Sequence, residues 1–189
     1  MFKSKKIKVT QKTDEQLISY ISNGCSDSFN ELYRRYHKRL LYYFYRMLWN
    51  DKDLAQDFLQ EIFYKIIDKP HLINPERKFS TWIFSVAYNM CKNEYRSKEV
   101  RKIIVFSENP DNFSEHKNEK TNHEQLVSEV FKELESFDES HKTAFLMKYR
   151  EGFNIDEISE ILELPKGTVK SRLFYTRKKL QEILSEKIC

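Results

Sequence analysis

The stretch N-I-D-E-I-S-E-I-L-E-L-P-K-G-T-V-K-S-R-L-F-Y-T-R-K-K-L-Q-E-I-L-S-E-K-I, residues 154–188, decides how the C-terminal part of the chain folds. A helix is predicted over 155–162, with Asn154 as its N-cap and Glu157 three residues on, as in a capping box. Pro165 then ends this pattern, because proline disfavours a helical residue before it and suits the first turn of a new helix. The second predicted helix carries one side of small and apolar residues at spacings of three and four: Val169, Leu173, Thr176, Leu180 and Leu184. A short helix, a tight turn and a longer helix predict a helix-turn-helix.

The charges of this stretch separate by helix. Those of the first helix and the turn are all acidic: Asp156, Glu157, Glu160 and Glu163. Those from Pro165 to Leu180 are all basic: Lys166, Lys170, Arg172, Arg177, Lys178 and Lys179. A DNA duplex is a dense line of negative charge, so a helix that lies in its groove should be basic. A solvated basic face on an ordinary helical hairpin fits the same pattern, so this stretch alone leaves both interpretations open.

Composition favours an all-α protein. The chain has 189 residues, of which only three are glycine and four are proline. Sheet proteins and nucleotide-cradling enzymes need glycine for turns and phosphate loops, so both classes are disfavoured. No apolar run reaches the length of a membrane span, and no apolar signal core follows the basic start, so we expect a cytoplasmic protein. The net charge of +4 fits nucleic-acid binding without establishing it.

Four helices are predicted in the N-terminal half from their periodicity. The expected N-caps are Thr13, Ser26 and Ser80, and the third helix is expected to begin at Asp51. In the third helix we expect an inner face formed by Leu54, Phe58, Ile62 and Ile66, whereas Leu59 and Phe63 have no clear place inside. The outward residues of this helix are expected to be Asp53, Asp57, Gln60 and Glu61. The segment 69–79 contains two prolines and is predicted to be a loop.

The helical pattern fades at about Lys98 and returns at Leu126. Between them lies a polar, mostly acidic segment that can bury little apolar surface. We therefore expect two small helical domains, residues 10–98 and 124–188, joined by a flexible linker over 99–123.

No convergent set of catalytic groups is visible, so we expect neither an enzyme nor a bound cofactor or metal. The five histidines are scattered, and Cys25, Cys91 and Cys189 have neither disulfide-framework nor zinc-finger spacing. A carboxylate metal site in a helical bundle would also need Glu-x-x-His pairs from facing helices, which the sequence lacks. The acidic face of the third helix is therefore either a solvated surface or a docking surface for a basic partner.

The fourth predicted helix combines rings, amides and cations. Its members are Trp82, Asn89, Lys92, Asn93, Tyr95 and Arg96. Single-stranded nucleic acid is bound by such a mixture, because bases stack on aromatic rings while cations meet the phosphates. Rings at helical spacing are also common in protein cores, so the residues alone leave this choice open.

Three segments carry specific motifs in a fixed order: residues 53–63, 79–89 and 137–173. In this order they resemble a bacterial RNA polymerase sigma factor of the extracytoplasmic-function type. D-L-A-Q-D-F-L-Q-E-I-F at 53–63 and F-S-T-W-I-F-S-V-A-Y-N at 79–89 resemble two helices of the family's second domain. The segment 137–173, which ends in G-T-V-K-S-R-L, resembles the family's fourth domain. The resemblance covers nearly all of residues 25–185. It implies sigma domain 2 at 10–98 and sigma domain 4 at 124–188.

The resemblance also implies roles for particular residues. Contacts to the polymerase would come from Asp53, Leu54, Asp57, Gln60, Glu61 and Phe63. Contacts to the single-stranded −10 element would come from Lys78, Trp82, Asn89, Lys92, Asn93 and Arg96. Contacts to the duplex −35 element would come from Lys166, Thr168, Lys170, Ser171, Arg172, Tyr175, Arg177 and Lys178. The implied partners are the clamp helices of the largest polymerase subunit, the flap region of the second largest, promoter DNA and an anti-sigma factor.

One departure from the family pattern and two other functions bear on this interpretation. Tyr88 stands where the family often has arginine, so the promoter sequence is not determined by the resemblance. A helix-turn-helix regulator that acts without polymerase would bind palindromic DNA by itself, as dimers tend to do. An enzyme acting on DNA would need an activated nucleophile, and the glycine-poor N-terminal half offers none.

Overall fold

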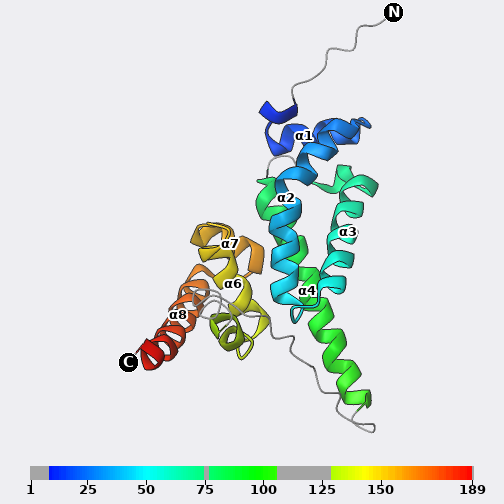
Figure 1. The fold of residues 1–189 in the computed structure, drawn as a ribbon. Coiled ribbons are helices and arrows are strands. Elements are labelled where there is room, and N and C mark those ends of the chain that lie inside the picture. Colours follow the sequence, from blue (N-terminus) through cyan, green and yellow to red (C-terminus); the bar gives the residue numbers. More distant parts are fainter. Residues whose placement is uncertain (1–8, 75–76, 106–128, 189) are drawn as a thin grey trace, which may run out of the picture. The chain divides into compact units, whose positions relative to one another are not determined.

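The computed structural model describes residues 9–74, 77–105 and 129–188, and every regular element among them is helical (Figure 1). The elements are η1 (Val9–Gln11), α1 (Asp14–Ser22), α2 (Ser26–Met47), α3 (Lys52–Asp68), η2 (Pro70–Leu72), α4 (Phe79–Val105), α6 (Glu139–Tyr149), α7 (Ile155–Leu162) and α8 (Lys166–Ile188). Residues 129–134 are helical as well. The predicted all-α class is confirmed for these residues. None of the described helices is long and apolar enough to cross a membrane.

Contacts divide the chain into two compact units, residues 1–88 and 89–189, and the division falls inside α4. This helix continues to Val105, past the position near Lys98 where the periodicity fades. The helix is therefore longer than expected. Most of the predicted linker, residues 106–123, lies outside the described residues, as does Leu126. The domain limits 10–98 and 124–188 stay a prediction.

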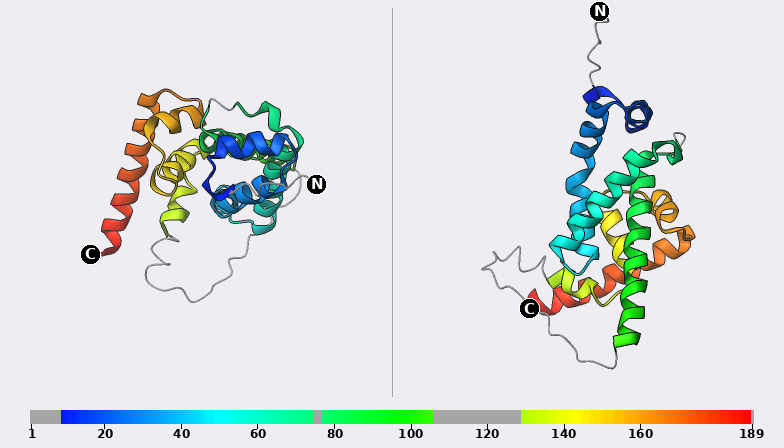
Figure 2. Two further views of the ribbon diagram at one scale, coloured as in Figure 1. Left: turned by 90° about the horizontal axis from the view of Figure 1, so that it is seen from above. Right: turned by 90° about the vertical axis from the view of Figure 1, so that its right-hand side faces the viewer.

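The first unit is built around α2, which packs against α1 and α3 (Figure 2). Its core is aromatic: Tyr43 and Phe44 are fully buried, and Phe84 of α4 meets Tyr43 edge-on with ring centroids 5.9 Å apart. The predicted cap of α1 is confirmed, because the Thr13 hydroxyl accepts from the backbone of Gln16 and the Gln16 side chain accepts from the backbone of Thr13. Helix α3 begins at Lys52, one residue later than expected, and Asp51 is its N-cap, because Asp51 Oδ1 accepts from Leu54 N at 3.0 Å.

Two predicted caps are wrong by one residue or more. The N-cap of α2 is Cys25, and Ser26 is the first helical residue. Helix α4 begins at Phe79, so Ser80 already lies within its first turn. In both cases the serine is already part of the helix, so it does not occupy the N-cap position.

The buried face of α3 is rotated from the predicted one. The side chains that α3 buries are Ala55, Leu59, Ile62, Phe63 and Ile66. The predicted Leu54 and Phe58 are only half-buried. The small Ala55 belongs to the buried stripe, whereas counting large apolar residues at steps of four favours the neighbouring row.

The second unit contains the predicted helix-turn-helix. Helices α6, α7 and α8 pack against one another and bury Ile158, Ile161 and Val169 completely. The predicted capping box is confirmed, because Asn154 Oδ1 accepts from Glu157 N at 2.9 Å and Glu157 Oε2 accepts from Asn154 N at 2.9 Å. The turn passes through Glu163, which has a left-handed backbone with φ of 54°.

Candidate nucleic-acid interface

Helix α8 presents a polar face because its other face is held in the core of the second unit. The inward residues are Val169, Leu173, Thr176 and Leu180, all of them buried as predicted. The side chain of Leu184 lies outside the described residues. Since helical side chains repeat every 3.6 residues, burial of this stripe turns the remaining positions toward solvent.

Most of the residues predicted to meet duplex DNA lie on that outward side. The exposed ones are Lys166, Lys170, Ser171, Tyr175, Arg177 and Lys178. Thr168 and Arg172 are half-buried. The Nη1 atom of Arg172 is buried and has no hydrogen-bond partner among the residues that the structure describes.

The turn between α7 and α8 is joined by an ion pair. Lys166 Nζ lies 2.9 Å from Asp156 Oδ1, and both side chains are well exposed. The pair links the first turn of α8 to the acidic helix α7. Because it is exposed, its contribution to stability is small, about 0–1 kcal/mol. Lys166 is therefore paired with a carboxylate within the protein. The six cations of this stretch, which look equivalent in the sequence, are not equivalent in the structure.

Sequence reasoning missed Phe174 on this surface. Its side chain is 53% exposed, and its ring meets that of Tyr175 edge-on with centroids 5.5 Å apart. An apolar ring among cations at i−4 and i+4, Lys170 and Lys178, is not explained by core packing. The signal was available in the sequence, because Phe174 falls one position after the buried Leu173 and therefore outside the inward stripe.

The residues predicted to meet single-stranded DNA follow one face of α4. Trp82, Asn89, Asn93 and Arg96 are separated by seven, four and three positions, which places them on the same side of a helix. Asn89, Asn93 and Arg96 are exposed, and Lys92 is half-buried. Lys78, just before the helix, is exposed. The arrangement combines amide groups and cations along a single edge.

Trp82 is half-buried, so it lies between the two alternatives that the sequence leaves open, a nucleic-acid-stacking ring and a core ring. Its ring lies against that of Phe79, with centroids 5.6 Å apart and planes tilted by 31°. One part of the indole is therefore fixed by the core while another remains accessible. Tyr88, where the family often has arginine, is buried at 4% exposure and contributes no side chain to this outer face.

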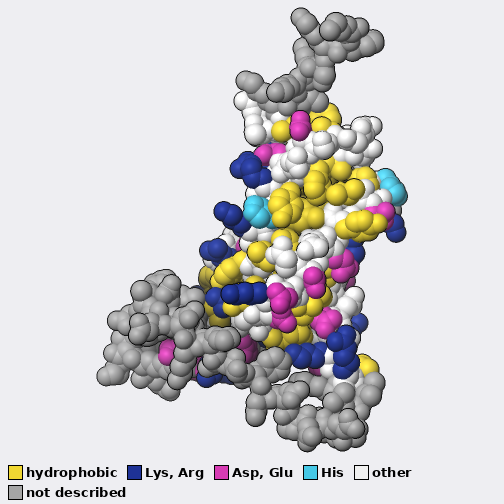
Figure 3. Space-filling view, turned by 45° about the vertical axis from the view of Figure 1, so that its right-hand side comes forward, with side chains coloured by type: hydrophobic (Ala, Val, Ile, Leu, Met, Phe, Trp, Pro, Cys, Tyr) yellow, Lys and Arg dark blue, Asp and Glu magenta, His cyan; other side chains and the backbone are white. Residues whose placement is uncertain are grey.

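Helix α3 has an exposed acidic face in the structure, as its sequence predicts. Asp53, Asp57, Gln60 and Glu61 are all exposed, and Figure 3 shows acidic side chains gathered beside an apolar patch on this side of the first unit. Exposed apolar side chains on α3 are Tyr64, at 64%, and Ile67, at 53%. The sequence argument omitted both, although Tyr64 follows Gln60 by one turn.

Phe63 does not belong to this face. It is only 4% exposed, and it packs against Tyr33 and Phe29 of α2 with centroid distances of 4.7 and 6.0 Å. The ring packs between α2 and α3 and presents little surface to a partner, so its assignment as a polymerase contact stays a prediction that this packing does not support. Leu54 is half-buried and contributes at most an edge to the outer surface.

Comparison with known families decides what these surfaces belong to. The family model described as Sigma-70 region 2 matches residues 32–101, and that of Sigma-70, region 4 matches residues 134–180. Together the two matches cover more than half of the chain. The chain belongs to the sigma-70 family. The region 2 match contains α3 and the described polar face of α4, and the region 4 match contains the helix-turn-helix.

Individual relatives place the chain in the extracytoplasmic-function group of this family. The ECF RNA polymerase sigma-E factor of Haemophilus influenzae is 28% identical over 182 residues, covering 90% of this chain and 95% of the relative. A solved structure of CnrH in complex with the cytosolic domain of CnrY matches with a TM-score of 0.68 at 19% identity, covering 93% of this chain and 99% of that one. The sigma factor RpoE of Bartonella quintana, solved with the anti-sigma factor NepR, matches with a TM-score of 0.69 at 18% identity, covering 83% of this chain and 96% of that one. At these identities the two structures support the fold.

Proposed function

We propose that this protein is a sigma factor that binds core RNA polymerase and directs it to promoters through two DNA-reading surfaces. The observation that carries the proposal is the pair of polar helix faces, one on α4 and one on α8, in a chain of the sigma-70 family. One face carries a half-exposed ring with amides and cations, and the other carries cations on the second helix of a helix-turn-helix. Two chemically different faces suit two forms of DNA.

The outward side of α8 is suited to duplex DNA. A major groove admits one α-helix, and phosphates on both of its walls attract cations. Lys170, Arg177 and Lys178 supply charge, whereas Ser171 supplies a hydroxyl that can bond to base edges. The exposed Phe174 adds an apolar surface to the same side. We assign this face to the −35 element.

The face of α4 is suited to unpaired bases. Trp82 offers a fixed ring for stacking, Asn89 and Asn93 offer donors and acceptors for base edges, and Arg96 offers charge. Binding the open strand more tightly than the duplex shifts the equilibrium toward the melted state, because a ligand favours the state for which it has the higher affinity. We assign this face to the −10 element and to promoter opening.

The acidic face of α3 is assigned to the polymerase. Asp53, Asp57 and Glu61 lie one turn apart, so they form a continuous negative stripe that a basic surface complements. Tyr64 and Ile67 extend it with apolar area. The proposed contacts are the clamp helices of the largest subunit for this face and the flap region of the second largest for the C-terminal unit. No reaction step by this chain is needed, and the protein would act in the cytoplasm, where polymerase and DNA meet.

A protein inhibitor is a further proposed partner. RpoE of Bartonella quintana was solved with the anti-sigma factor NepR, and CnrH was solved with the cytosolic domain of CnrY. Similarity of fold supports the proposal that an anti-sigma factor binds this chain as well and competes with the polymerase.

Transcription with purified core polymerase on genomic DNA fragments tests the proposal. We expect the protein to start transcripts at defined positions that core alone does not use, and we expect those positions to share two upstream sequence elements. A helix-turn-helix regulator would bind the same fragments without core and start nothing. Absence of specific transcripts together with absence of core binding would contradict the proposal.

A further inference from the structure

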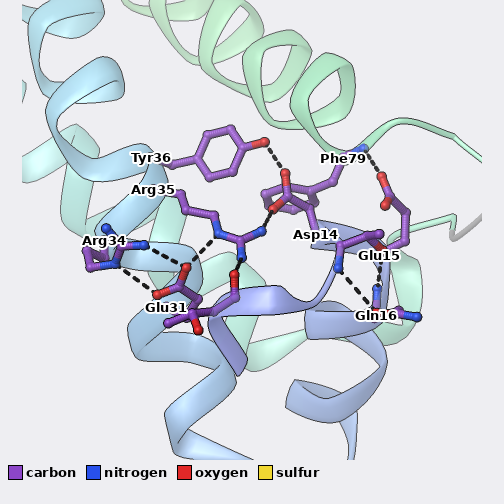
Figure 4. A network of polar contacts seen from close by, with 10 residues as sticks. Asp14, Glu15, Gln16, Glu31, Arg34, Arg35, Tyr36 and Phe79 are labelled. Atoms are coloured by element: carbon purple, nitrogen blue, oxygen red, sulfur yellow. Dashed lines mark hydrogen bonds and ion pairs between the residues drawn. The ribbon is translucent and has the colours of Figure 1, made fainter. Parts of the chain in front are cut away.

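Helix α1 is hydrogen-bonded to the start of α4. The backbone N–H of Phe79, the first residue of α4, donates to Glu15 Oε1 of α1 at 3.2 Å (Figure 4). The first N–H groups of a helix have no acceptor within the helix itself. A carboxylate at this end is also favoured by the helix dipole. Glu15 therefore does for α4 what Ser80 was expected to do, from a position 64 residues away in the sequence.

Glu15 is held in place because α1 is anchored on α2 immediately beside it. Asp14 accepts hydrogen bonds from Arg35 Nη1, at 2.7 Å, and from the Tyr36 hydroxyl. Arg35 in turn donates through Nε to Glu31 Oε1 at 2.8 Å. Partial burial works to raise the pKa of Glu15. The Glu15 carboxylate accepts hydrogen bonds from its own backbone N–H, from the backbone N–H of Phe79 and from the Thr13 side chain. Together these hydrogen bonds outweigh burial and hold the pKa of Glu15 below its usual value.

A row of rings leads from this anchor to Trp82. The Tyr36 ring, 3% exposed, meets the ring of Phe79 edge-on with centroids 5.2 Å apart. Phe79, 1% exposed, is the ring against which Trp82 lies. The backbone N–H of Trp82 donates to the backbone carbonyl of Lys78 at 3.1 Å and closes the first turn of α4. The orientation of Trp82 thus depends on where this first turn is held.

We propose that Asp14 and Glu15 of α1 are positioning residues for promoter opening, because they fix the first turn of α4 and with it the orientation of Trp82. This inference rests on the proposed function of the α4 face. Helix α1 precedes the matched region 32–101, so the family match does not account for it. The role assigned to α1 is indirect: its two carboxylates act through Phe79 and Tyr36 and need no contact with DNA.

A purely structural role of α1 makes a different prediction. Leu17, Ile18 and Ile21 of α1 are buried, so α1 also adds to the stability of the first unit. In that case any weakening of α1 should impair the protein equally. Gln16 gives the matched control, because its side chain accepts from Thr13 N at 3.2 Å within the first turn of α1, whereas Glu15 reaches α4.

The first measurement is local to Trp82. The chain has two tryptophans, so a Trp49→Phe background leaves Trp82 as the only fluorophore of its kind. We expect Glu15→Ala to raise acrylamide quenching of Trp82, because the first turn of α4 is no longer held. Gln16→Ala should leave quenching at the parent value. Tyr36→Phe removes the hydroxyl that binds Asp14 but keeps the ring against Phe79, so a smaller rise is expected.

The second measurement uses the full chain with core polymerase on one promoter in two forms, fully paired and with an unpaired −10 segment. Glu15→Ala should lower open-complex formation on the paired form by about five-fold, the effect of losing one typical hydrogen bond. The affinity of the Glu15→Ala protein for core polymerase should equal that of the wild type, whichever promoter form is used. Glu15→Gln keeps an acceptor oxygen and should lose less, and it answers the question if Glu15→Ala does not fold.

Equal losses for Glu15→Ala and Gln16→Ala, or unchanged quenching of Trp82 in both Glu15 variants, would overturn the inference. Failure of the wild-type protein to form open complexes with core would overturn the proposed function, and this inference with it. The two failures are distinguishable, because only the second affects the wild type.

Discussion

Replacement of Glu31 by glutamine tests how the first unit holds together. This carboxylate is only 5% exposed and accepts three short bonds. Arg34 donates Nε and Nη2 to its two oxygens at 2.8 Å, and Arg35 donates Nε at 2.8 Å. The bonds from Arg34 lower its pKa most, burial opposes them, and Arg35 adds to the lowering, so that the pKa is about 2 instead of the ordinary 4.5.

The size of the effect follows from these contacts. The difference between the two pKa values sets an upper limit of about 3–4 kcal/mol on the stabilisation. Arg34 is 66% exposed, so solvent screens its share of the attraction. We therefore expect Glu31→Gln to lower the free energy of unfolding by about 1–2 kcal/mol at pH 7.

The pH dependence has a definite sign. Above about pH 4.5 the carboxylate is charged in both the folded and the unfolded chain, so its stabilisation is fully present. Between pH 4.5 and about 2 the unfolded chain takes up a proton that the folded chain does not, so the stabilisation is lost as the pH falls. The difference between wild type and Glu31→Gln should shrink over this range.

Urea unfolding followed by tryptophan fluorescence measures these values, since Trp49 and Trp82 both belong to the first unit. Glu61→Gln is the matched control. Glu61 pairs with Lys65 at 2.7 Å, but the two side chains are 53% and 44% exposed, so its loss should cost at most about 0.5 kcal/mol. Equal effects of the two substitutions, or a Glu31→Gln difference that is as large at pH 3 as at pH 7, would refute the reasoning.

Three further changes test the surfaces and the helix-turn-helix. Asp57→Arg reverses one charge of the exposed stripe on α3 and should weaken core binding at least about ten-fold without changing thermal stability, as measured by titration with labelled core; unchanged affinity would mean that this face is only solvated. Lys170→Ala removes one exposed cation of α8 and should reduce the slope of log affinity against log salt by about 1 in filter binding of holoenzyme to duplex promoter DNA; an unchanged slope would place Lys170 away from the phosphates. Asn154→Ala removes the cap of α7 and should lower the free energy of unfolding of the second unit by about 1 kcal/mol in thermal melts; no loss would show that the capping box is redundant there.

Local signals in the sequence predicted much of this structure. Thr13 and Asn154 each have the side chain that an N-cap requires and a helical pattern directly after it, and both act as caps. The inward stripe of α8 is also local, since it follows from spacing alone. The acidic face of α3 was found for the same reason.

The errors arise where a distant segment decides. Periodicity gave Leu59 and Phe63 no clear place inside α3, and the rings of Phe29 and Tyr33 on α2 are what Phe63 packs against. Ser80 looked like a cap, whereas the acceptor for the start of α4 is Glu15, far away in the sequence. The half-burial of Trp82 likewise depends on Phe79 and the packing behind it. A single sequence contains no signal for such pairings.

Permanganate mapping of unpaired thymines on a promoter identified by transcription tests the central claim most directly, namely that one chain reads duplex DNA with α8 and opens DNA with α4. The account predicts reactive thymines across the downstream element only when both core polymerase and this protein are present, while the upstream element stays paired and unreactive. Replacement of Asn89 by alanine should reduce this reactivity without loss of upstream protection. Reactive thymines with core alone, or upstream binding that is never followed by opening, would contradict the account.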